Sequence, residues 1–262
     1  MTKDESPESI WDRHWRSREV PAKALLASQT VTTGYDTLRG MVTESDTSLL
    51  EAGCGTGAHC YMLARDFPHA TVTGLDYSET AVSRAREIFN LPNLHFVQGD
   101  LFDLPYDDGA WDVVFNEGVI EHFRPDGERS YMAALHEMVR VTRPGGKVIV
   151  SVPNFYCLPH TVYKALMGPR FEYGYEKSFR PYELRAAFEA AGLRVTSWRG
   201  CNFAVGIGSW RRIVSVVGYA AGACERFYTA ARPYLGWAMD PFGHMVFMCG
   251  TKVQHEAETA RA

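Results

Sequence analysis

Three glycines follow a short apolar run in the stretch LLEAGCGTGAH, residues 49–59. Glycine lets a backbone turn sharply and approach a bound ligand closely. As Gly-x-Gly-x-x-Ala over residues 53–58, the stretch satisfies the relaxed dinucleotide fingerprint of an NAD enzyme. As Glu-x-Gly-x-Gly-x-Gly over residues 51–57, it indicates a different nucleotide-like cofactor and a different reaction. The loop alone leaves both interpretations open.

Acidic residues around the loop narrow the choice. Asp76 comes about twenty residues after the glycines, where a carboxylate can accept both hydroxyls of a ribose. Asp100 ends the apolar run LHFVQGD, where it can accept a hydrogen bond from the exocyclic amine of adenine. Glu51 places a negative charge just before the glycines, which suits a cationic ligand better than a pyrophosphate. These features favour an adenosine-type cofactor with a cationic end.

The elements that must position these residues follow from the hydrophobic pattern. Apolar runs alternate with helical stretches from residue 47 onward, which predicts βα units and a mostly parallel sheet. We expect helices at 58–66, 78–89, 126–142 and 180–192, with Ser78 as an N-cap and RPGG (143–146) as a helix stop. We expect strands at 47–53, 70–76, 94–100, 111–118, 147–154, 193–200 and 244–253.

Four stretches carry a family resemblance: LLEAGCGTG, VTGLDYS, VQGDLFDLPYDDGAWDVVFNEGVIEH and LHEMVRVTRPGGKVIVSVPN. They follow one another within residues 47–154, and together they resemble class I S-adenosylmethionine-dependent methyltransferases. The likeness is to the small-molecule, type 11-like group that includes quinone-biosynthesis methyltransferases. It implies a Rossmann-like α/β fold: a seven-stranded, mostly parallel sheet with an antiparallel last strand and helices on both faces. HMVFMCGTKV (244–253) fits that last strand.

The resemblance also implies a cofactor, S-adenosylmethionine, and a product, S-adenosylhomocysteine. It implies that Glu51 and the backbone of Gly53, Gly55 and Gly57 hold the methionine portion. Asp76 would take the ribose hydroxyls, and Tyr77 would pack beside the adenine. The remaining cofactor-binding residues it implies are Asp100 and Leu101 at the adenine edge, and Asn116 beside the methionine and sulfonium end.

A base is needed when a hydroxyl acceptor must lose its proton, whereas a neutral amine needs little help. The best candidates for a catalytic residue are His122 and Glu117, with Glu121 third. His122 follows the fourth strand, where an imidazole could face the acceptor. The alternative is that His122 only supports the short helix after that strand.

Acceptor-binding candidates lie outside the region of resemblance. We expect an N-terminal helical arm or lid at 1–46, and a methyltransferase domain at 47–262 with cap insertions at about 155–180 and 202–240. The candidate substrate-binding residues are Trp11 and Trp15 in the arm, and His160, Tyr163, Tyr173 and Tyr175 in the first insertion. Each is equally open to a structural interpretation, as cover for the sheet. The second insertion can be interpreted in three ways, as a substrate cap, a dimer surface or a patch for a lipid-like acceptor. His244 is expected to be structural.

Composition restricts the partners. The formal net charge is −4 over 262 residues, with no long run of one sign, which argues against a general nucleic-acid or anionic-membrane binder. The six cysteines are scattered, and no metal-ligand spacing occurs, so no metal is expected. No signal peptide or membrane-spanning run is recognisable. We therefore expect a cytoplasmic monomer or homodimer that acts on a small molecule.

Three functions are consistent with these features of the sequence. The first is methyl transfer to an oxygen or nitrogen of a small-molecule acceptor, in secondary metabolism. The second is carbon methylation of a quinone or another prenylated, lipid-like ring. The third, from another class, is a non-catalytic protein that binds S-adenosylmethionine. An NAD-dependent oxidoreductase is the residual alternative left by the glycine loop.

Overall fold

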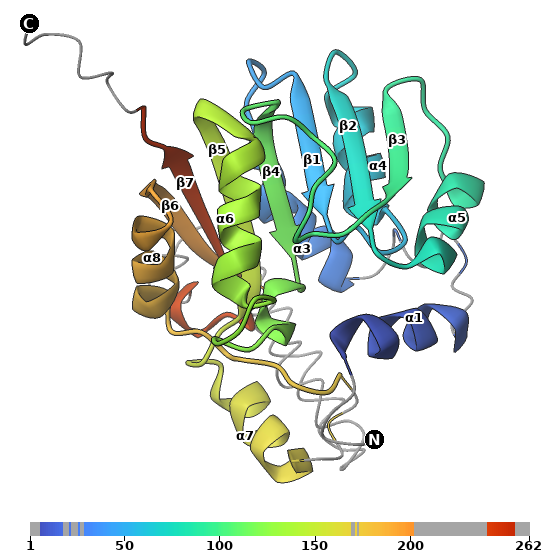
Figure 1. Cartoon of the computed structure of the whole chain (residues 1–262). Helices are drawn as coiled ribbons and strands as arrows, with labels where there is room; N and C mark the ends of the chain where they lie inside the picture. Colours follow the sequence, from blue (N-terminus) through green and yellow to red (C-terminus); the bar gives the residue numbers. More distant parts are fainter. Residues whose placement is uncertain are drawn as a thin grey trace, which may run out of the picture.

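A seven-stranded sheet forms the centre of the protein in the computed structural model (Figure 1). The structure describes residues 6–17, 21, 26, 29–168, 171, 173–201 and 240–254. The strands, in chain order, are β1 Ser48–Ala52, β2 Thr71–Asp76, β3 Leu94–Gln98, β4 Trp111–Glu117, β5 Thr142–Pro153, β6 Leu193–Cys201 and β7 Met245–Lys252. Each predicted strand is present, with shifted ends.

The sheet order is β3-β2-β1-β4-β5-β7-β6. Strands β1 to β5 run parallel, and β7 is antiparallel to both neighbours, β5 and β6. The predicted fold class is therefore confirmed. The strand order reverses between β1 and β4, and ligands of open α/β sheets bind at the carboxyl ends of the strands beside such a reversal.

Two hydrophobic clusters hold helices on the two faces of the sheet. Helices α3 (Gln29–Arg39), α4 (Ala58–Asp66) and α5 (Glu79–Ile88) cover one face, and Leu38 and Leu63 are among the side chains buried there. Helices α6 (Tyr131–Val141) and α8 (Pro181–Ala190) cover the other face. The central strands are buried on both sides, which explains their near-continuous apolar sequences.

The helix boundaries follow from their capping residues. Helix α4 has the predicted bounds, and Ser78 caps α5 by accepting a hydrogen bond from the backbone N–H of Ala81. Helix α6 starts at Tyr131 rather than at 126, because the hydroxyl of Ser130 accepts from the Ala133 N–H and fixes the helix start there. The prediction of helix for 126–130 was wrong.

Strand β5 begins earlier than predicted, at Thr142. Its ladder with β4 pairs Trp111 with Thr142 and next pairs Val113 with Lys147. Residues 143–146 thus lie outside the regular pairing with β4, and helix α6 ends before them at Val141, so RPGG does follow a helix end.

The remaining elements lie at the carboxyl end of the sheet. Helix α1 (Pro7–Ser17) lies beneath the carboxyl ends of β1, β2 and β4 in Figure 1, and α7 (Leu158–Met167) lies below β5. Two short 3-10 helices are η1 (Ile120–His122), which follows β4, and η4 (Asp240–Phe242), which precedes β7. Of the second predicted insertion, residues 202–239 lie outside the described residues.

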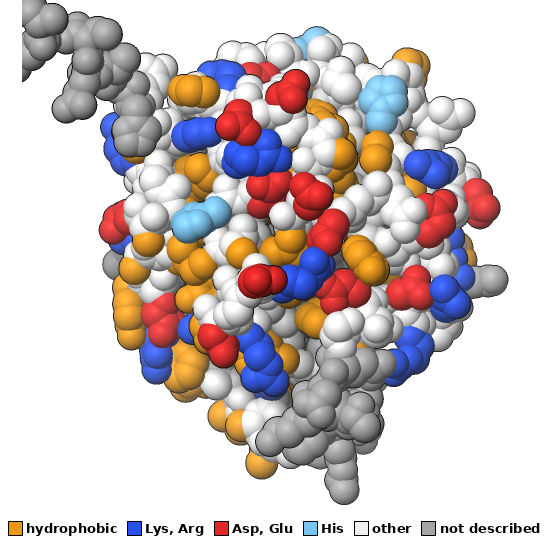
Figure 2. Space-filling view, in the orientation of Figure 1, with side chains coloured by type: hydrophobic (Ala, Val, Ile, Leu, Met, Phe, Trp, Pro, Cys, Tyr) orange, Lys and Arg blue, Asp and Glu red, His pale blue; other side chains and the backbone are white. Residues whose placement is uncertain are grey.

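Two surface properties bear on partners. Acidic and basic side chains are interspersed on the face seen in Figure 2, without a continuous basic patch among its coloured residues. Within the described ranges, no helix has the length and apolar character needed to cross a membrane.

Candidate active site

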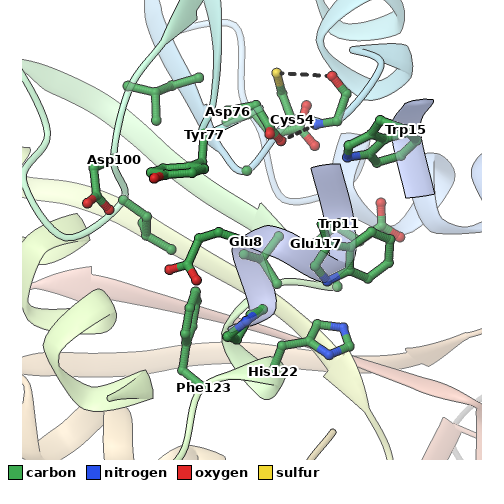
Figure 3. Close-up of a pocket in the computed structure, with 18 of the residues that line it drawn as sticks. Glu8, Trp11, Trp15, Cys54, Asp76, Tyr77, Asp100, Glu117, His122 and Phe123 are labelled. Atoms are coloured by element: carbon green, nitrogen blue, oxygen red, sulfur yellow. Dashed lines mark hydrogen bonds between the residues drawn. The ribbon is translucent and has the colours of Figure 1, made fainter. Parts of the chain in front are cut away.

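A cavity of about 280 Å³ lies between helix α1 and the carboxyl ends of β1, β2 and β4 (Figure 3). Its walls combine aromatic rings with ionisable side chains. They are formed by Pro7, Glu8, Trp11, Trp15, Glu51, Gly53, Cys54, Gly55, Thr56, Ala58, His59, Leu75, Asp76, Tyr77, Asp100, Leu101, Phe102, Glu117, Gly118, Val119, His122, Phe123 and Arg129. The cavity therefore lies where the strand order predicts a ligand site.

The glycine loop forms one side of this cavity. Gly55 has a φ of +52°, and a Cβ there would lie 2.8 Å from the ring of Trp15, so only glycine fits this close approach. Gly53 also lines the cavity. Gly57, at a φ of +77°, is instead covered by Phe96, whose ring would meet a Cβ at 2.3 Å. Two of the three predicted glycines thus line the cavity. Gly57 lies outside the lining, and its positive φ allows the turn of the loop.

Asp76 ends β2 against the glycine loop. One carboxylate oxygen accepts from the backbone N–H of Gly55 at 2.7 Å, and the other accepts from that of Ser78 at 2.9 Å. Burial raises the pKa of Asp76, and these two hydrogen bonds oppose the rise. Its neighbour Tyr77 lines the cavity with half of its surface exposed. Both predicted residues thus line the cavity.

Asp100 lies farther along the same wall and is held by an arginine. Both its oxygens accept from the guanidinium of Arg129, at 2.8 and 3.0 Å, and Arg129 also donates to Glu8 of α1 at 2.7 Å. Partial burial raises the pKa of Asp100, but the Arg129 charge and hydrogen bonds outweigh it and keep the pKa below its usual range. Leu101 is buried beside Asp100 and lines the cavity.

Two carboxylates and a histidine also line the cavity. Nδ1 of His59 lies 2.5 Å from Oε2 of Glu117 and 3.7 Å from Oε1 of Glu51. The thiol of Cys60 donates to Glu51 at 2.9 Å. Burial raises the pKa of Glu51, against the opposing effect of His59 and Cys60. The structure brings Glu51 and Glu117 together through His59, a residue to which the sequence analysis assigned no role.

His122 lies at the end of η1 and faces the cavity beside Trp11, with ring centroids 5.2 Å apart. Its Nδ1 lies 2.9 Å from the carbonyl oxygen of Tyr175, and a carbonyl only accepts, so Nδ1 carries the proton. Burial lowers the pKa of His122, and the nearby Glu176 charge opposes this only in part. The imidazole is therefore neutral at pH 7 with its lone pair on Nε2.

Glu121 and Asn116 are buried behind the cavity wall and do not line it. Burial and the neighbouring Glu176 charge raise the pKa of Glu121 well above its ordinary value. Asn116 donates from Nδ2 to the carbonyl of Ala52 on β1, and its Oδ1 accepts from the N–H of Ile120 at 3.4 Å. Asn116 therefore ties β4 to the end of β1 from a position behind the predicted methionine end.

Helix α1 lies across the cavity and brings both predicted tryptophans to it. Trp15 covers Gly55, and Trp11 stacks on Tyr173 at 5.6 Å. The helix is held by Glu8 at its start, by Asp12, which accepts from Ser78 at 2.7 Å, and by the Trp15 carbonyl, to which Arg84 donates. Three separate contacts thus fix this helix over the glycine loop.

The other predicted acceptor residues lie outside the cavity. Tyr173 stacks on the Trp11 ring, and the carbonyl of Tyr175 pairs with His122, so each tyrosine lies behind a residue of the cavity wall. His160 and Tyr163 are buried on α7, where Nε2 of His160 lies 3.1 Å from Glu176. The structure therefore does not bring His160 and Tyr163 into the cavity with the other candidates.

The sequence did not predict every cavity residue; among those missed are His59, the pair Glu8 and Arg129, and the rings of Phe102 and Phe123. His59 carried a usable signal, since it stands two residues after the last glycine, in the first turn of the helix that the loop leads into. Within the described ranges, no group of three potential ligands is placed to hold a metal ion.

The fold and the site together define a class of protein. A seven-stranded sheet of this order, a glycine loop after β1, and acidic residues at the ends of β2 and beyond β3 are the features of class I S-adenosylmethionine-dependent methyltransferases. The family model described as "Methyltransferase domain" matches residues 50–150. The chain belongs to this family, whose cofactor is S-adenosylmethionine.

Sequence relatives carry more specific names. Demethylmenaquinone methyltransferase of Staphylococcus aureus is 30% identical over 195 residues, which cover 65% of this chain and 79% of that protein. Fatty-acid O-methyltransferase of Mycolicibacterium smegmatis is 42% identical over 98 residues, 37% of this chain and 34% of that protein. This chain thus spans about a third of the length of the first relatives it matches.

Solved structures support the fold. A methyltransferase from Haloferax volcanii, in complex with its activator, superimposes with a TM-score of 0.69 at 20% identity, over 96% of this chain and 99% of that chain. A methyltransferase from Thermotoga maritima, named as a possible histamine N-methyltransferase, gives a TM-score of 0.64 at 16% identity, over 94% and 99% of the two chains. At these identities the likeness concerns the fold alone.

Proposed function

We propose that this protein transfers the methyl group of S-adenosylmethionine to an oxygen or nitrogen of a small-molecule acceptor. The observation that carries the proposal is the shared cavity. It is lined by the glycine loop with Asp76, by the group Glu51, His59 and Glu117, and by His122 beside the Trp11 ring. A cofactor with a ribose and a cationic end is matched by the first two groups, which leaves His122 for the acceptor.

The cofactor-binding residues keep the roles that the family resemblance implies, with two refinements. Asp76 is proposed to accept the ribose hydroxyls, and Tyr77 to pack beside the adenine. Asp100 and Leu101 are proposed to recognise the adenine edge, with Arg129 holding the Asp100 carboxylate in place. Glu51, Gly53 and Gly55 are proposed to bind the methionine portion. Asn116 and Gly57 are proposed to support this surface from behind.

When bound, S-adenosylmethionine supplies a methyl carbon that is activated for in-line displacement by its bond to a positively charged sulfur. The protein's task is to align the acceptor and to exclude water. Trp11, Trp15 and Phe123 give the cavity an apolar surface for both purposes. For a hydroxyl acceptor, Nε2 of His122 is proposed to take the proton, because the hydrogen bond from Nδ1 to Tyr175 fixes the required tautomer.

Carbon methylation of a quinone-like ring is the second candidate. The Staphylococcus aureus relative that supports it carries the name demethylmenaquinone methyltransferase. The name fatty-acid O-methyltransferase, borne by another relative, favours oxygen instead. Both names suit the aromatic lining of the cavity, and we propose an acceptor with an apolar body. A cytoplasmic location and a monomeric or homodimeric state remain predictions.

A labelled-methyl transfer screen over fatty acids, phenols, amines and demethylated quinones tests the proposal, with the product position assigned. Labelled products from an acid, phenol or amine support the lead, and a carbon-methylated ring supports the second candidate. Thermal shifts with S-adenosylmethionine, S-adenosylhomocysteine and NADH run beside it, because a ligand raises the melting temperature of the fold that binds it. Stabilisation by S-adenosylmethionine with no product in any arm indicates a non-catalytic binding protein. Stabilisation by NADH alone overturns the proposal.

A further inference from the structure

His59 stands between two strands that meet at the sheet's reversal point. It lies in the first turn of α4, and its ring reaches the carboxylates at the ends of β1 and β4. Nδ1 is within hydrogen-bond distance of Glu117, at 2.5 Å, and within ion-pair distance of Glu51, at 3.7 Å. Only one-tenth of the His59 side chain is exposed, and that surface is part of the cavity wall.

Acidic side chains face His59 from two neighbouring strands. Glu51 faces it from β1 and Glu117 from β4, and Cys60 of its own helix acts through Glu51. Helix α3 brings Gly34 against Glu117, and α1 brings the uncharged Trp15 to the same cavity. The two side chains that face His59 from the strands are therefore both acidic.

This arrangement favours a protonated imidazole while the site holds no cation. Burial by itself would lower the pKa of His59, but the charge and hydrogen bond of Glu117, together with Glu51, outweigh burial and hold the pKa well above its ordinary value. An imidazolium at this position offsets part of the negative charge of the two carboxylates that it contacts. Without its proton, the wall would be more negative by one charge and would attract a cation more strongly.

We propose that His59 is a positioning residue of the cofactor site, which holds Glu51 and Glu117 at the cavity wall and releases its proton to solvent when a cationic cofactor binds beside them. The inference rests on the proposed function, because it takes S-adenosylmethionine as the cation. The cofactor's positive charge takes the place of the imidazolium as counter-ion for the carboxylates. Charge balances, since one positive charge arrives as one proton leaves.

The consequence is a linkage between pH and cofactor affinity. Binding that requires proton loss becomes tighter as the pH rises between the pKa of His59 in the complex and its higher pKa in the free protein. A full proton per cofactor corresponds to a dissociation constant that falls about tenfold per pH unit. A purely structural histidine gives no such slope.

The substitution His59→Asn separates the two roles. The asparagine amide can place a nitrogen close to the position of Nδ1, so it can still donate to Glu117, but it does not titrate. We expect H59N to fold and to bind S-adenosylmethionine with a pH slope much smaller than that of the wild-type protein. Titration of the cofactor's own amino group affects both proteins equally and cancels in the comparison.

Calorimetric titration from pH 6 to 8.5, in buffers of different ionisation enthalpy, measures both the slope and the protons released. His95→Asn, at an exposed position on β3, is the matched control and should behave as wild type. His59→Gln provides a second non-titrating variant if H59N does not fold. Equal slopes for wild type and these variants, or no proton release by wild type, overturn the inference and leave the proposed function standing. Failure of the wild type to bind S-adenosylmethionine at every pH overturns both.

Discussion

The carboxylate of Asp76 accepts a hydrogen bond from the backbone N–H of Gly55 at a distance of 2.7 Å. This bond joins the end of β2 to the glycine loop that follows β1, so it fixes the position of the loop relative to β2. The same carboxylate lines the cavity. Asp76 thus shapes the loop, and in its proposed role it also accepts the ribose hydroxyls of the cofactor.

Replacing Asp76 should therefore weaken cofactor binding strongly. A hydrogen bond to a charged group contributes about 1.5–3 kcal/mol, so Asp76→Ala should raise the dissociation constant for S-adenosylmethionine by roughly tenfold to a hundredfold. Asp76→Asn keeps one acceptor oxygen and should fall between alanine and wild type. Calorimetric titration measures the effect, with Asp107→Ala at an exposed position as control. Unchanged affinity of the alanine variant would refute the ribose role.

The salt bridges of Arg129 connect Glu8 of helix α1 to Asp100, the residue proposed to recognise the adenine edge. Arg129→Gln should release Glu8 and Asp100 together, whereas Glu8→Gln should release only α1. Because the Arg129 side chain is nearly half exposed, we expect little loss of global stability. We expect instead faster proteolysis near α1 in both variants, and weaker S-adenosylmethionine binding mainly in Arg129→Gln. Equal binding by R129Q and wild type would show that Asp100 does not depend on this arginine.

The pattern of strands and acidic residues made much of this site predictable. Parallel strands end at one edge of the sheet, so Glu51, Asp76 and Asp100 had to come near one another once the strands were recognised. Trp11 and Trp15 share a helix face because they are four residues apart. These relationships are local or follow from strand direction alone, and both can be read in a single sequence.

The rest depends on how helices rotate against the sheet. His160 and Tyr163 lie on a helix whose buried face is set by its packing, and that packing turns them away from the cavity. The role of His59 depends on Glu117, which is 58 positions away along the chain but 2.5 Å away in space. The start of α6 was missed because Ser130, and not an earlier residue, supplies the cap. Tertiary contacts determine the orientation of the α7 side chains, the role of His59 and the start of α6.

His244 should make the protein sensitive to mild acid. Burial and the neighbouring His160 lower its pKa to about 3, and within the described residues neither ring nitrogen has a hydrogen-bond partner. The unfolded chain therefore binds a proton at His244 near pH 6.5, whereas the folded chain does not. The free energy of unfolding that His244 contributes above pH 6.5 is thus lost as the pH falls toward 3. Between pH 6.5 and 5 this one group should cost about 2 kcal/mol.

The substitution His244→Phe removes this titration. Urea unfolding at pH 7 and pH 5 measures the difference, because groups distant from His244 titrate equally in both proteins. We expect the wild-type free energy of unfolding to fall more than that of the variant over this range. A parallel fall in both proteins would mean that His244 is solvated in solution. His69→Phe, at an exposed position, serves as the control.

His122 is expected to matter for the chemical step and not for cofactor binding. A positioned general base contributes about 10²–10⁴-fold, so His122→Ala should slow methylation of a hydroxyl acceptor by that order while the dissociation constant for S-adenosylmethionine stays near wild type. Because burial holds the pKa of His122 below its ordinary value, the wild-type rate should rise with pH below about 6.5 and stay level above it. The methylation rate of an amine acceptor, which needs no base when the amine is neutral, should fall far less in this variant. Exposed His136→Ala is the control for a lost imidazole. Full activity of H122A with a hydroxyl acceptor would leave His122 only its hydrogen bond to Tyr175, as a support for the loop after β4.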